Sequence, residues 1–261
     1  MLYVKNLSFS YEKEKNKRTK NCSYELNNIT FSLDQEKIYA LIGSNGAGKT
    51  TLFKCILNML TSYEGLIEVD GKDIKTLSAR ELAKFISYIP QQREIAFSYS
   101  VLDTILMGTT NSLKIYEKPK EKEIDKAKEA LSLLGIEKLK YRSYNYLSGG
   151  EKQLVLIARA IAQNAKIILM DEPTSALDYY NQHLVMKVVR MLKEKGYGII
   201  ISCHNPQMVL NYSDELIAIK ESKIVEKGLT KEIVSEKFIK KLYNMDVKII
   251  KENEGYVILP I

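Results

Sequence analysis

Two glycine-rich segments of the chain have the composition of loops that bind phosphate. Residues 43–50 fit the pattern G-x-x-x-x-G-K-[ST] at every specified position, and they lie between an apolar segment, 38–42, and a helical pattern, 51–60. Residues 148–150, Ser-Gly-Gly, open a second helical pattern, where backbone N–H groups favour an anion. We therefore predict two loops that contact phosphate.

The first loop also predicts how the phosphates and a cation are held. Its glycines allow the backbone to close around phosphate groups, while Lys49 can reach the β and γ oxygens. The Thr50 hydroxyl can ligate Mg²⁺. The candidate nucleotide-contacting residues of this loop are Ser44, Asn45, Gly46, Ala47, Gly48, Lys49, Thr50 and Thr51.

A pair of acidic residues follows an apolar segment later in the chain. Asp171 ends a predicted buried strand, where a lone carboxylate would be costly unless a cation compensates its charge, so we predict that it faces Mg²⁺. Glu172, one residue further on, is the best candidate for the base that polarises an attacking water. The alternative for Glu172 is that it only caps the turn through Pro173.

Two further polar residues follow predicted strands at the presumed site. His204 comes after the strand at 198–202, and Gln91 comes after the strand at 87–89 and Pro90. A structural role is the alternative for each of them, because a lone histidine is more often structural than catalytic and a polar residue commonly ends a strand.

The elements that must position these residues predict an α/β fold. Segments 2–10, 24–33 and 65–69 read as an N-terminal antiparallel β subdomain. Between 92 and 164 helical patterns take over, at 101–107, 124–134 and 150–163, and predict an inserted α-helical subdomain. Apolar strands at 167–170 and 198–202 alternate with a helix at 180–195, which predicts a RecA-like P-loop core with a mostly parallel sheet. Beyond 228 we expect a short helical piece and a hairpin that pairs 247–250 with 256–259.

Composition restricts the class of protein. The 261 residues are 45% hydrophobic, enough for one large core or a core with a subdomain, and the net charge of +7 is spread over mixed lysines and glutamates. The most basic run, 13–20, is expected to be an exposed loop. No segment approaches the roughly 18 apolar residues of a membrane helix, and the three cysteines lack metal-ligand spacing. We expect a cytosolic chain in a reducing compartment.

Both loops together with the acidic strand end resemble the ATP-binding subunit of ABC transporters, over residues 3–228. The resemblance implies ATP and Mg²⁺ as ligands, Glu172 as the catalytic base, and His204 as a γ-phosphate contact that orients the water. It makes Gln91 a contact of Mg²⁺ or the water that also links the nucleotide to the helical subdomain. Tyr11 resembles the adenine-stacking aromatic of this family; its alternative is a strand-end tyrosine packed on the hairpin.

The resemblance also implies a dimer. One phosphate tail cannot easily be enclosed by two distant loops of one subunit, and in the family each ATP lies between the first loop of one subunit and the Ser-Gly-Gly loop of the other. Ser148, Gly149 and Gly150 would then bind the partner's nucleotide, and Asp178 would cross the same interface. We expect a two-fold dimer, most simply a homodimer, with two equivalent sites.

Segments 97–108, 177–182 and 243–260 resemble ATPases of iron-chelate, haem and cobalamin importers, while His204 is followed by Asn205 where the family commonly has aspartate. Molybdate and tungstate importers share these segments, so the cargo is a metal chelate or a metal oxyanion. A separate permease and, indirectly, a substrate-binding protein are implied, with this chain on the cytoplasmic face of the membrane and no nucleic acid bound. Two alternatives are a soluble ABC ATPase acting on DNA or the ribosome, and a module that binds ATP without useful turnover.

Overall fold

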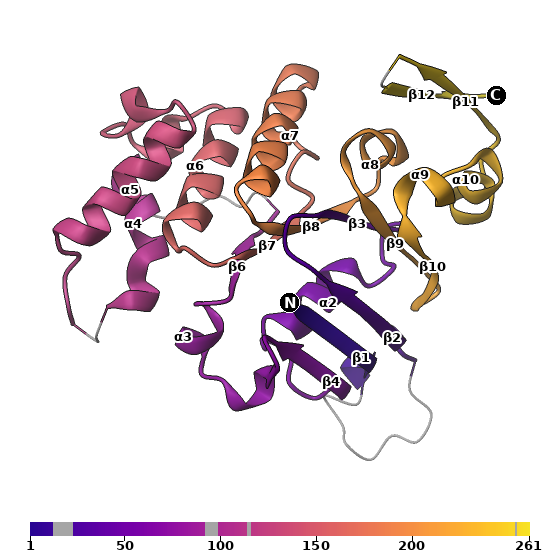
Figure 1. The fold of residues 1–261 in the computed structure, drawn as a ribbon, viewed down its shortest axis with the longest axis horizontal. Coiled ribbons are helices and arrows are strands. Elements are labelled where there is room, and N and C mark those ends of the chain that lie inside the picture. The colour runs from indigo at the N-terminus through magenta and orange to yellow at the C-terminus, as the bar shows by residue number, and fades with distance from the viewer. Residues whose placement is uncertain (13–22, 92–98, 114–115, 254) are drawn as a thin grey trace. The chain divides into compact units, whose positions relative to one another are not determined.

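The computed structural model describes residues 1–12, 23–91, 99–113, 116–253 and 255–261 (Figure 1). The basic run 13–20 and residues 97 and 98 of the importer-like segment lie outside these ranges. The chain divides into two compact units, one formed by Met1–Ser78 with Gly198–Ile261 and the other by Ala79–Tyr197. The sequence-based boundaries, with a helical subdomain at 92–164 and an extension from 229, stay predictions.

The first unit begins with an antiparallel sheet in the order β2-β1-β4-β5. Strand β1 pairs with β2 through Leu2↔Leu33 and with β4 through Leu2↔Val69. The strands are β1 (Leu2–Phe9), β2 (Leu26–Leu33), β4 (Glu64–Val69) and β5 (Lys72–Asp73). The predicted N-terminal antiparallel subdomain is confirmed.

The same unit holds strands in the order β10-β9-β3-β8. Strand β3 is parallel to both β8 and β9, while β10 runs antiparallel to β9. Every residue of β3 is buried, as expected for a parallel strand covered on both faces. The elements are β3 (Ile38–Ile42), α2 (Lys49–Ile56), β8 (Gly198–Cys203), α8 (Pro206–Tyr212), β9 (Glu215–Lys220) and β10 (Lys223–Leu229).

The C-terminal part of the first unit adds helices and a hairpin. It consists of α9 (Thr230–Ile233), α10 (Glu236–Tyr243), β11 (Val247–Glu252) and β12 (Gly255–Pro260). The predicted hairpin is confirmed, with Ile250 opposite Val257. Its inner side and α10 pack with α8 and with residues of β3 and β9 in one hydrophobic cluster, which includes Ile42, Val209, Leu216, Phe238 and Val247.

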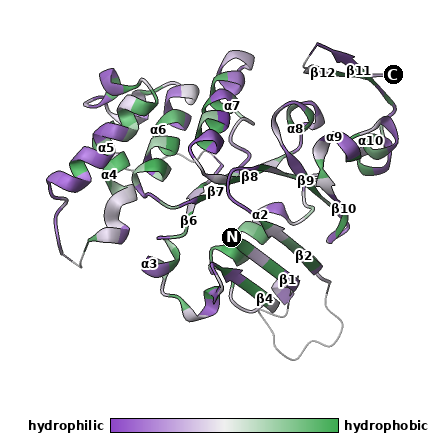
Figure 2. Ribbon diagram, viewed as in Figure 1, coloured by the Kyte–Doolittle hydropathy of each residue, from purple (hydrophilic) through white to green (hydrophobic). Residues whose placement is uncertain are grey.

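The second unit combines two parallel strands with several helices. Strand β6 is parallel to β7, with Ile89 opposite Met170. The elements are α3 (Ala79–Leu82), β6 (Ile86–Ile89), α4 (Val101–Leu106), α5 (Glu121–Leu133), α6 (Gly149–Ala162), β7 (Ile167–Asp171) and α7 (Tyr179–Glu194). Helices α5 and α7 carry both hydrophilic and hydrophobic residues along their length in Figure 2, as expected of helices with one face against a core.

The structure differs from the sequence-based assignment in residues 206–229. No element was expected there, whereas α8, β9 and β10 occupy this stretch. The signal for β9 was present, because its central residues are apolar and buried. The predicted helix at 51–60 corresponds to the shorter α2, which ends at Ile56.

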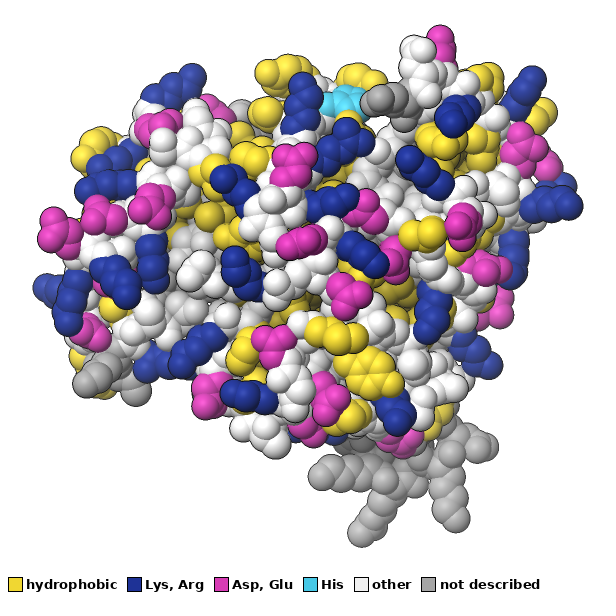
Figure 3. Space-filling view, in the orientation of Figure 1, with side chains coloured by type: hydrophobic (Ala, Val, Ile, Leu, Met, Phe, Trp, Pro, Cys, Tyr) yellow, Lys and Arg dark blue, Asp and Glu magenta, His cyan; other side chains and the backbone are white. Residues whose placement is uncertain are grey.

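The described surface fits the mixed charge expected from the sequence. On the face shown in Figure 3, Lys and Arg side chains are interspersed with Asp and Glu side chains. Among the described residues, none of the helices combines the length and the apolar composition needed to cross a membrane.

Candidate functional site

The residues predicted to do chemistry are divided between the two units. The first unit carries Tyr11, the loop 43–51 and His204, and the second carries the remaining candidates. Each set makes contacts of its own. The candidates of the second unit are Gln91, Ser148, Gly149, Gly150, Asp171, Glu172 and Asp178.

The glycine-rich loop runs from the end of β3 to the start of α2 and folds around its own lysine. Lys49 is only 6% exposed. Its Nζ donates to the carbonyl oxygens of Gly43, at 2.8 Å, and Ser44, at 3.1 Å. The ammonium is therefore held within the loop, where arriving phosphate oxygens can exchange for carbonyl oxygens. Ser44, Asn45 and Thr50 are exposed.

Gly48 is required at the junction of this loop and α2. It is the N-cap of α2 and has φ of 97°, in the left-handed region that favours glycine. A Cβ at this position would also lie 2.6 Å from the carbonyl oxygen of Glu25. Both the backbone angle and the close approach of Glu25, the residue before β2, exclude a side chain at this position, so the loop conformation depends on this glycine.

Tyr11 lies beside the helix that follows the loop. Its hydroxyl is 3.5 Å from that of Thr51 on α2, and its N–H donates to Glu25 Oε2 at 3.1 Å. The ring packs edge-on against Phe9, with 4.9 Å between centroids. The structure thus brings Tyr11 close to the phosphate loop, although its contact with adenine stays a prediction.

His204 follows β8, and its side chain is exposed. Its carbonyl oxygen accepts a hydrogen bond from the Tyr243 hydroxyl at 3.0 Å. Asn205 forms the N-cap of α8, because its Oδ1 accepts from the N–H groups of Gln207 and Met208. The histidine therefore sits in a short link between a buried strand and a capped helix.

Asp171 ends β7 as predicted and is 3% exposed. The Tyr88 hydroxyl, on the neighbouring strand β6, donates to Asp171 Oδ2 at 3.4 Å. The sequence analysis did not identify Tyr88, because only the parallel pairing of β6 with β7 brings it to the carboxylate. A buried carboxylate at a strand end is suited to a cation.

Glu172 lies next to Gln91, so the structure brings these two strand-end residues together. Gln91 Nε2 donates to Glu172 Oε2 at 3.3 Å. Glu172 has φ of 47°, in the left-handed region that a residue with a side chain rarely adopts.

The Ser-Gly-Gly loop forms the start of α6, a helix of 14 residues. Ser148 and Glu151 make a capping box: Ser148 Oγ accepts from Glu151 N at 3.3 Å, and Glu151 Oε2 accepts from Ser148 N at 2.9 Å. The latter bond is the main cause that lowers the pKa of Glu151. Because Ser148 is exposed, the positive end of α6 is accessible to an anion.

Asp178 is the N-cap of α7 and is also exposed. It accepts from Asn181 N at 2.9 Å and from Asn181 Nδ2 at 2.8 Å, and these bonds lower the pKa of Asp178. Asn181 also packs closely on Gly150: a Cβ there would lie 2.2 Å from Asn181 Oδ1. Asn181 thus links the starts of α6 and α7, a role that the sequence analysis missed.

Replacing Gly150 by alanine should test this contact. Asn181 is held by Asp178, so the added methyl group forces a shift, and we expect the free energy of unfolding to fall by about 1–3 kcal/mol. Urea denaturation of Gly150→Ala, Asn181→Ala and the double variant measures the coupling. The double variant should be less destabilised than the sum of the single variants; simple additivity would contradict the contact.

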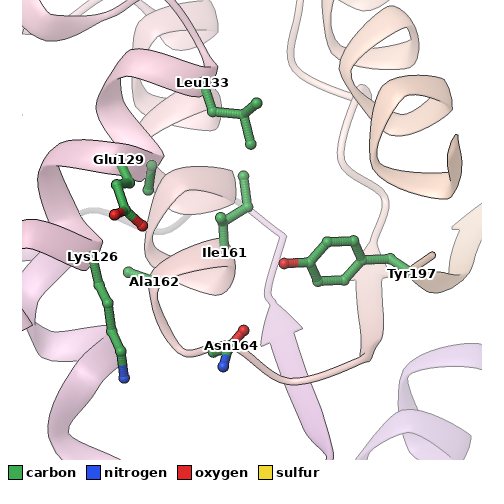
Figure 4. A pocket seen from close by; sticks show the side chains of 8 residues that line it. Lys126, Glu129, Leu133, Ile161, Ala162, Asn164 and Tyr197 are labelled. Atoms are coloured by element: carbon green, nitrogen blue, oxygen red, sulfur yellow. The ribbon is translucent and has the colours of Figure 1, made fainter. Parts of the chain in front are cut away.

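A separate hollow of about 340 Å³ lies between α5, the end of α6 and Tyr197 (Figure 4). Its lining includes Lys126, Glu129, Leu133 and Ile161. None of the candidate site residues contributes to it, so this hollow is distinct from the predicted nucleotide-binding residues.

The described residues contain no group of three or more His, Cys, Asp or Glu side chains placed to hold a metal ion. Mg²⁺ does not need one, because it is commonly bound by one or two carboxylates together with water and substrate phosphates. The buried Asp171 carboxylate fits that kind of site.

Known sequences resemble this chain over most of its length. Residues 26–175, more than half of the chain, match the model of the ABC transporter family. A Haemophilus influenzae protein named "Uncharacterized ABC transporter ATP-binding protein" is 37% identical over 97% of this chain and 93% of its own length. A Helicobacter pylori protein named "Probable iron chelatin transport ATP-binding protein" is 35% identical over 99% and 98%.

Solved structures give the same result. An inward-facing metal-chelate type ABC transporter has a chain with a TM-score of 0.84 and 30% identity, over 100% of this chain and 96% of that one. A dimeric post-hydrolysis state of an ATP-binding cassette bound to ADP and Pi has a TM-score of 0.74 and 25% identity, over 88% and 99%. The α/β fold predicted from the sequence is confirmed.

Proposed function

Since the chain belongs to the ABC transporter family and is an ATPase coupled to transport, we propose that it drives the import of a metal chelate through a separate permease. We assign the ATPase activity to particular residues mainly because Gln91 contacts Glu172. Glu172 follows the buried Asp171 and has a left-handed backbone conformation. Such an arrangement suits a carboxylate that acts on a water beside a bound cation.

We assign ATP to the glycine-rich loop of the first unit. Lys49, held at the loop carbonyl groups, would exchange these partners for β and γ oxygens of the triphosphate. Residues 44–51 supply backbone N–H groups and hydroxyl groups to the phosphates. Tyr11, next to Thr51, would stack on adenine.

Asp171, Thr50 and Gln91 would hold Mg²⁺ together with phosphate oxygens. The bound ion would neutralise negative charge that develops on the phosphates during transfer. Tyr88 orients Asp171 by its hydrogen bond to Oδ2. Removal of divalent cations should therefore abolish hydrolysis.

The proposed hydrolysis needs one base and one donor. Glu172 accepts a proton from the attacking water, whose oxygen forms a bond to the γ-phosphorus while the bond to the β–γ bridging oxygen breaks. ADP and phosphate are the products. His204 donates a hydrogen bond to the γ-phosphate and orients the water; loss of one such preorganised donor costs about 10² to 10³ in rate.

ABC ATPase cassettes work as dimers with transmembrane permeases, and the two anion-binding loops of this chain support a head-to-tail dimer. Ser148, Gly149 and Gly150 would contact the nucleotide of the partner, and Asp178 would cross the interface. Large aromatic side chains next to both segments are exposed: Tyr146 at 80%, Tyr179 at 77% and Tyr180 at 74%. Tyrosine is enriched in protein interfaces, which favours contact at these two segments.

A metal chelate is the cargo that the relatives support best. One relative is named for iron chelatin transport, and one structural neighbour is a metal-chelate type transporter. The chain would act at the cytoplasmic face of the membrane, bound to the permease. The cargo itself would pass through the permease after delivery by a separate binding protein.

Identification of the proteins that co-purify with this chain tests the importer proposal. The chain is tagged in its own cell, the membranes are gently solubilised, and the bound proteins are identified by mass spectrometry. We expect a permease with several membrane spans, together with a metal-binding lipoprotein. Recovery with ribosomes or DNA from the soluble fraction alone would contradict the proposal and favour a soluble ABC machine.

A further inference from the structure

The C-terminal extension holds the backbone of the proposed catalytic histidine. Tyr243, the last residue of α10, donates its hydroxyl hydrogen to the carbonyl oxygen of His204 at 3.0 Å. The two residues are 39 positions apart in the sequence. The His204 side chain is exposed, whereas Tyr243 is partly buried. Of the two residues, the tyrosine is therefore the one that the surrounding protein holds in place.

The Tyr243 hydroxyl remains a donor over the physiological pH range. Burial raises the pKa of Tyr243 well above its ordinary value, with a smaller contribution from Cys203. The phenol therefore stays protonated.

A second set of contacts holds the chain just after the histidine. Helix α8 begins at Pro206, and its side-chain amides bind the backbone of β12. Asn211 Nδ2 donates to Tyr256 O at 2.9 Å, Asn211 Oδ1 accepts from Tyr256 N at 2.8 Å, and Gln207 Oε1 accepts from Ile258 N at 3.3 Å. The backbone of β12 is thus hydrogen-bonded to side chains of α8.

Apolar packing adds to this attachment. Phe238, Ile239 and Leu242 of α10 share a buried cluster with Val209 and Leu210 of α8, and Tyr243 packs against this cluster. In Figure 1, α8, α10 and the β11–β12 hairpin lie at the same end of the first unit. The extension therefore contacts the chain at two places: Tyr243 binds the carbonyl group of His204, and β12 binds α8, which begins two residues later.

We propose that Tyr243 is a positioning residue for ATP hydrolysis: through its hydroxyl, the C-terminal extension fixes the backbone of His204 and so the place of its imidazole. This inference rests on the proposed function, in which His204 contacts the γ-phosphate. The packing of the C-terminal extension would then affect the position of His204 and, through it, the rate of ATP hydrolysis. A change that loosens the hairpin would slow turnover without touching the nucleotide.

Tyr243→Phe tests this role because it removes the hydroxyl and keeps the ring. Loss of one hydrogen bond of ordinary strength predicts a kcat lower by about 3- to 10-fold, with KM for ATP unchanged. The matched control is Tyr256→Phe, which removes a tyrosine hydroxyl from the hairpin and should leave kcat at the parent value. Melting followed by circular dichroism checks that both variants are folded.

Proton NMR of the imidazoles gives a readout that does not depend on activity. The sequence contains only two histidines, His204 and His183, and the latter lies on α7 beside Tyr179. Tyr243→Phe should shift the His204 Hε1 resonance and leave that of His183 in place, since phenylalanine preserves the ring current. Tyr256→Phe should shift neither resonance.

Comparison with His204→Ala distinguishes a failure of the proposed role of His204 from a failure of the positioning role of Tyr243. Full hydrolysis by His204→Ala would overturn the proposed role of the histidine, and the positioning role with it. Strongly reduced hydrolysis by His204→Ala, combined with parent kcat and an unshifted His204 resonance in Tyr243→Phe, would overturn only the positioning role. A lower kcat with a shifted resonance in Tyr243→Phe supports it.

Discussion

Exchange of Glu172 for glutamine should abolish ATP hydrolysis while ATP binding is retained. The amide keeps the size and the hydrogen-bonding reach of the side chain, but it cannot accept the proton of the attacking water. Loss of a general base typically lowers a rate by about 10² to 10⁴. Because Gln91 Nε2 now donates to Glu172 Oε2 at 3.3 Å, the glutamine can keep this contact through its own carbonyl oxygen. A phosphate-release assay and a nucleotide-binding measurement check the two halves of the expectation.

The same variant should trap the dimer, because ATP stays between the proposed interface loops. Light scattering should show monomers without nucleotide and dimers of Glu172→Gln with ATP. Glu194→Gln, at the exposed end of α7, is a control with the same charge change and should hydrolyse ATP at the parent rate. Undiminished hydrolysis by Glu172→Gln would refute the base assignment, and a monomer at saturating ATP would refute the dimer.

Replacement of Lys49 by alanine should weaken ATP binding and reduce turnover still more strongly. The lysine is buried, and its ammonium is already positioned by two carbonyl oxygens of the loop. Its bonds to phosphate would be charge-assisted, and loss of a bond worth roughly 1.5–3 kcal/mol weakens affinity by about 10- to 150-fold. Turnover falls further, because the lysine also stabilises charge in the transition state. Calorimetric titration with ATP measures the affinity.

Lys54→Ala provides the matched control for this experiment. Lys54 lies on the same helix, α2, and is partly exposed, so its loss changes the net charge equally without removing a phosphate ligand. We expect parent affinity and parent turnover from it. Equal ATP affinity of Lys49→Ala and the parent would show that the loop binds phosphate without its lysine, against the proposal.

Several elements could be predicted from the sequence because their signals lie in adjacent residues. The loop at 43–50 lies between β3 and α2 because a phosphate loop needs a strand, glycines and a helix start in immediate succession. Asp171 ends β7 because an apolar run followed by an acidic pair marks a strand end. In the same way the hairpin of β11 and β12 was readable from two apolar segments around a polar turn.

In the region from 206 to 229, local rules could not reveal the strand pairing, although β9 itself carries an apolar signal. The sequence analysis assigned no element there, although β9 is an apolar strand that pairs with β3. Its partner is more than 170 residues away, so nothing near it in the sequence indicates the pairing. The same holds for Tyr88 at Asp171, where the two residues are 83 positions apart.

The sequence by itself determined the family, the α/β class and the order of the phosphate-binding and acidic segments, because each depends on residues close together along the chain. Only the tertiary structure decided which side chains support them. Asn181 packs on Gly150 and Tyr243 binds the carbonyl group of His204 because helices and strands from distant segments meet in the fold. Such contacts depend on distance in space, for which spacing along the chain carries little information.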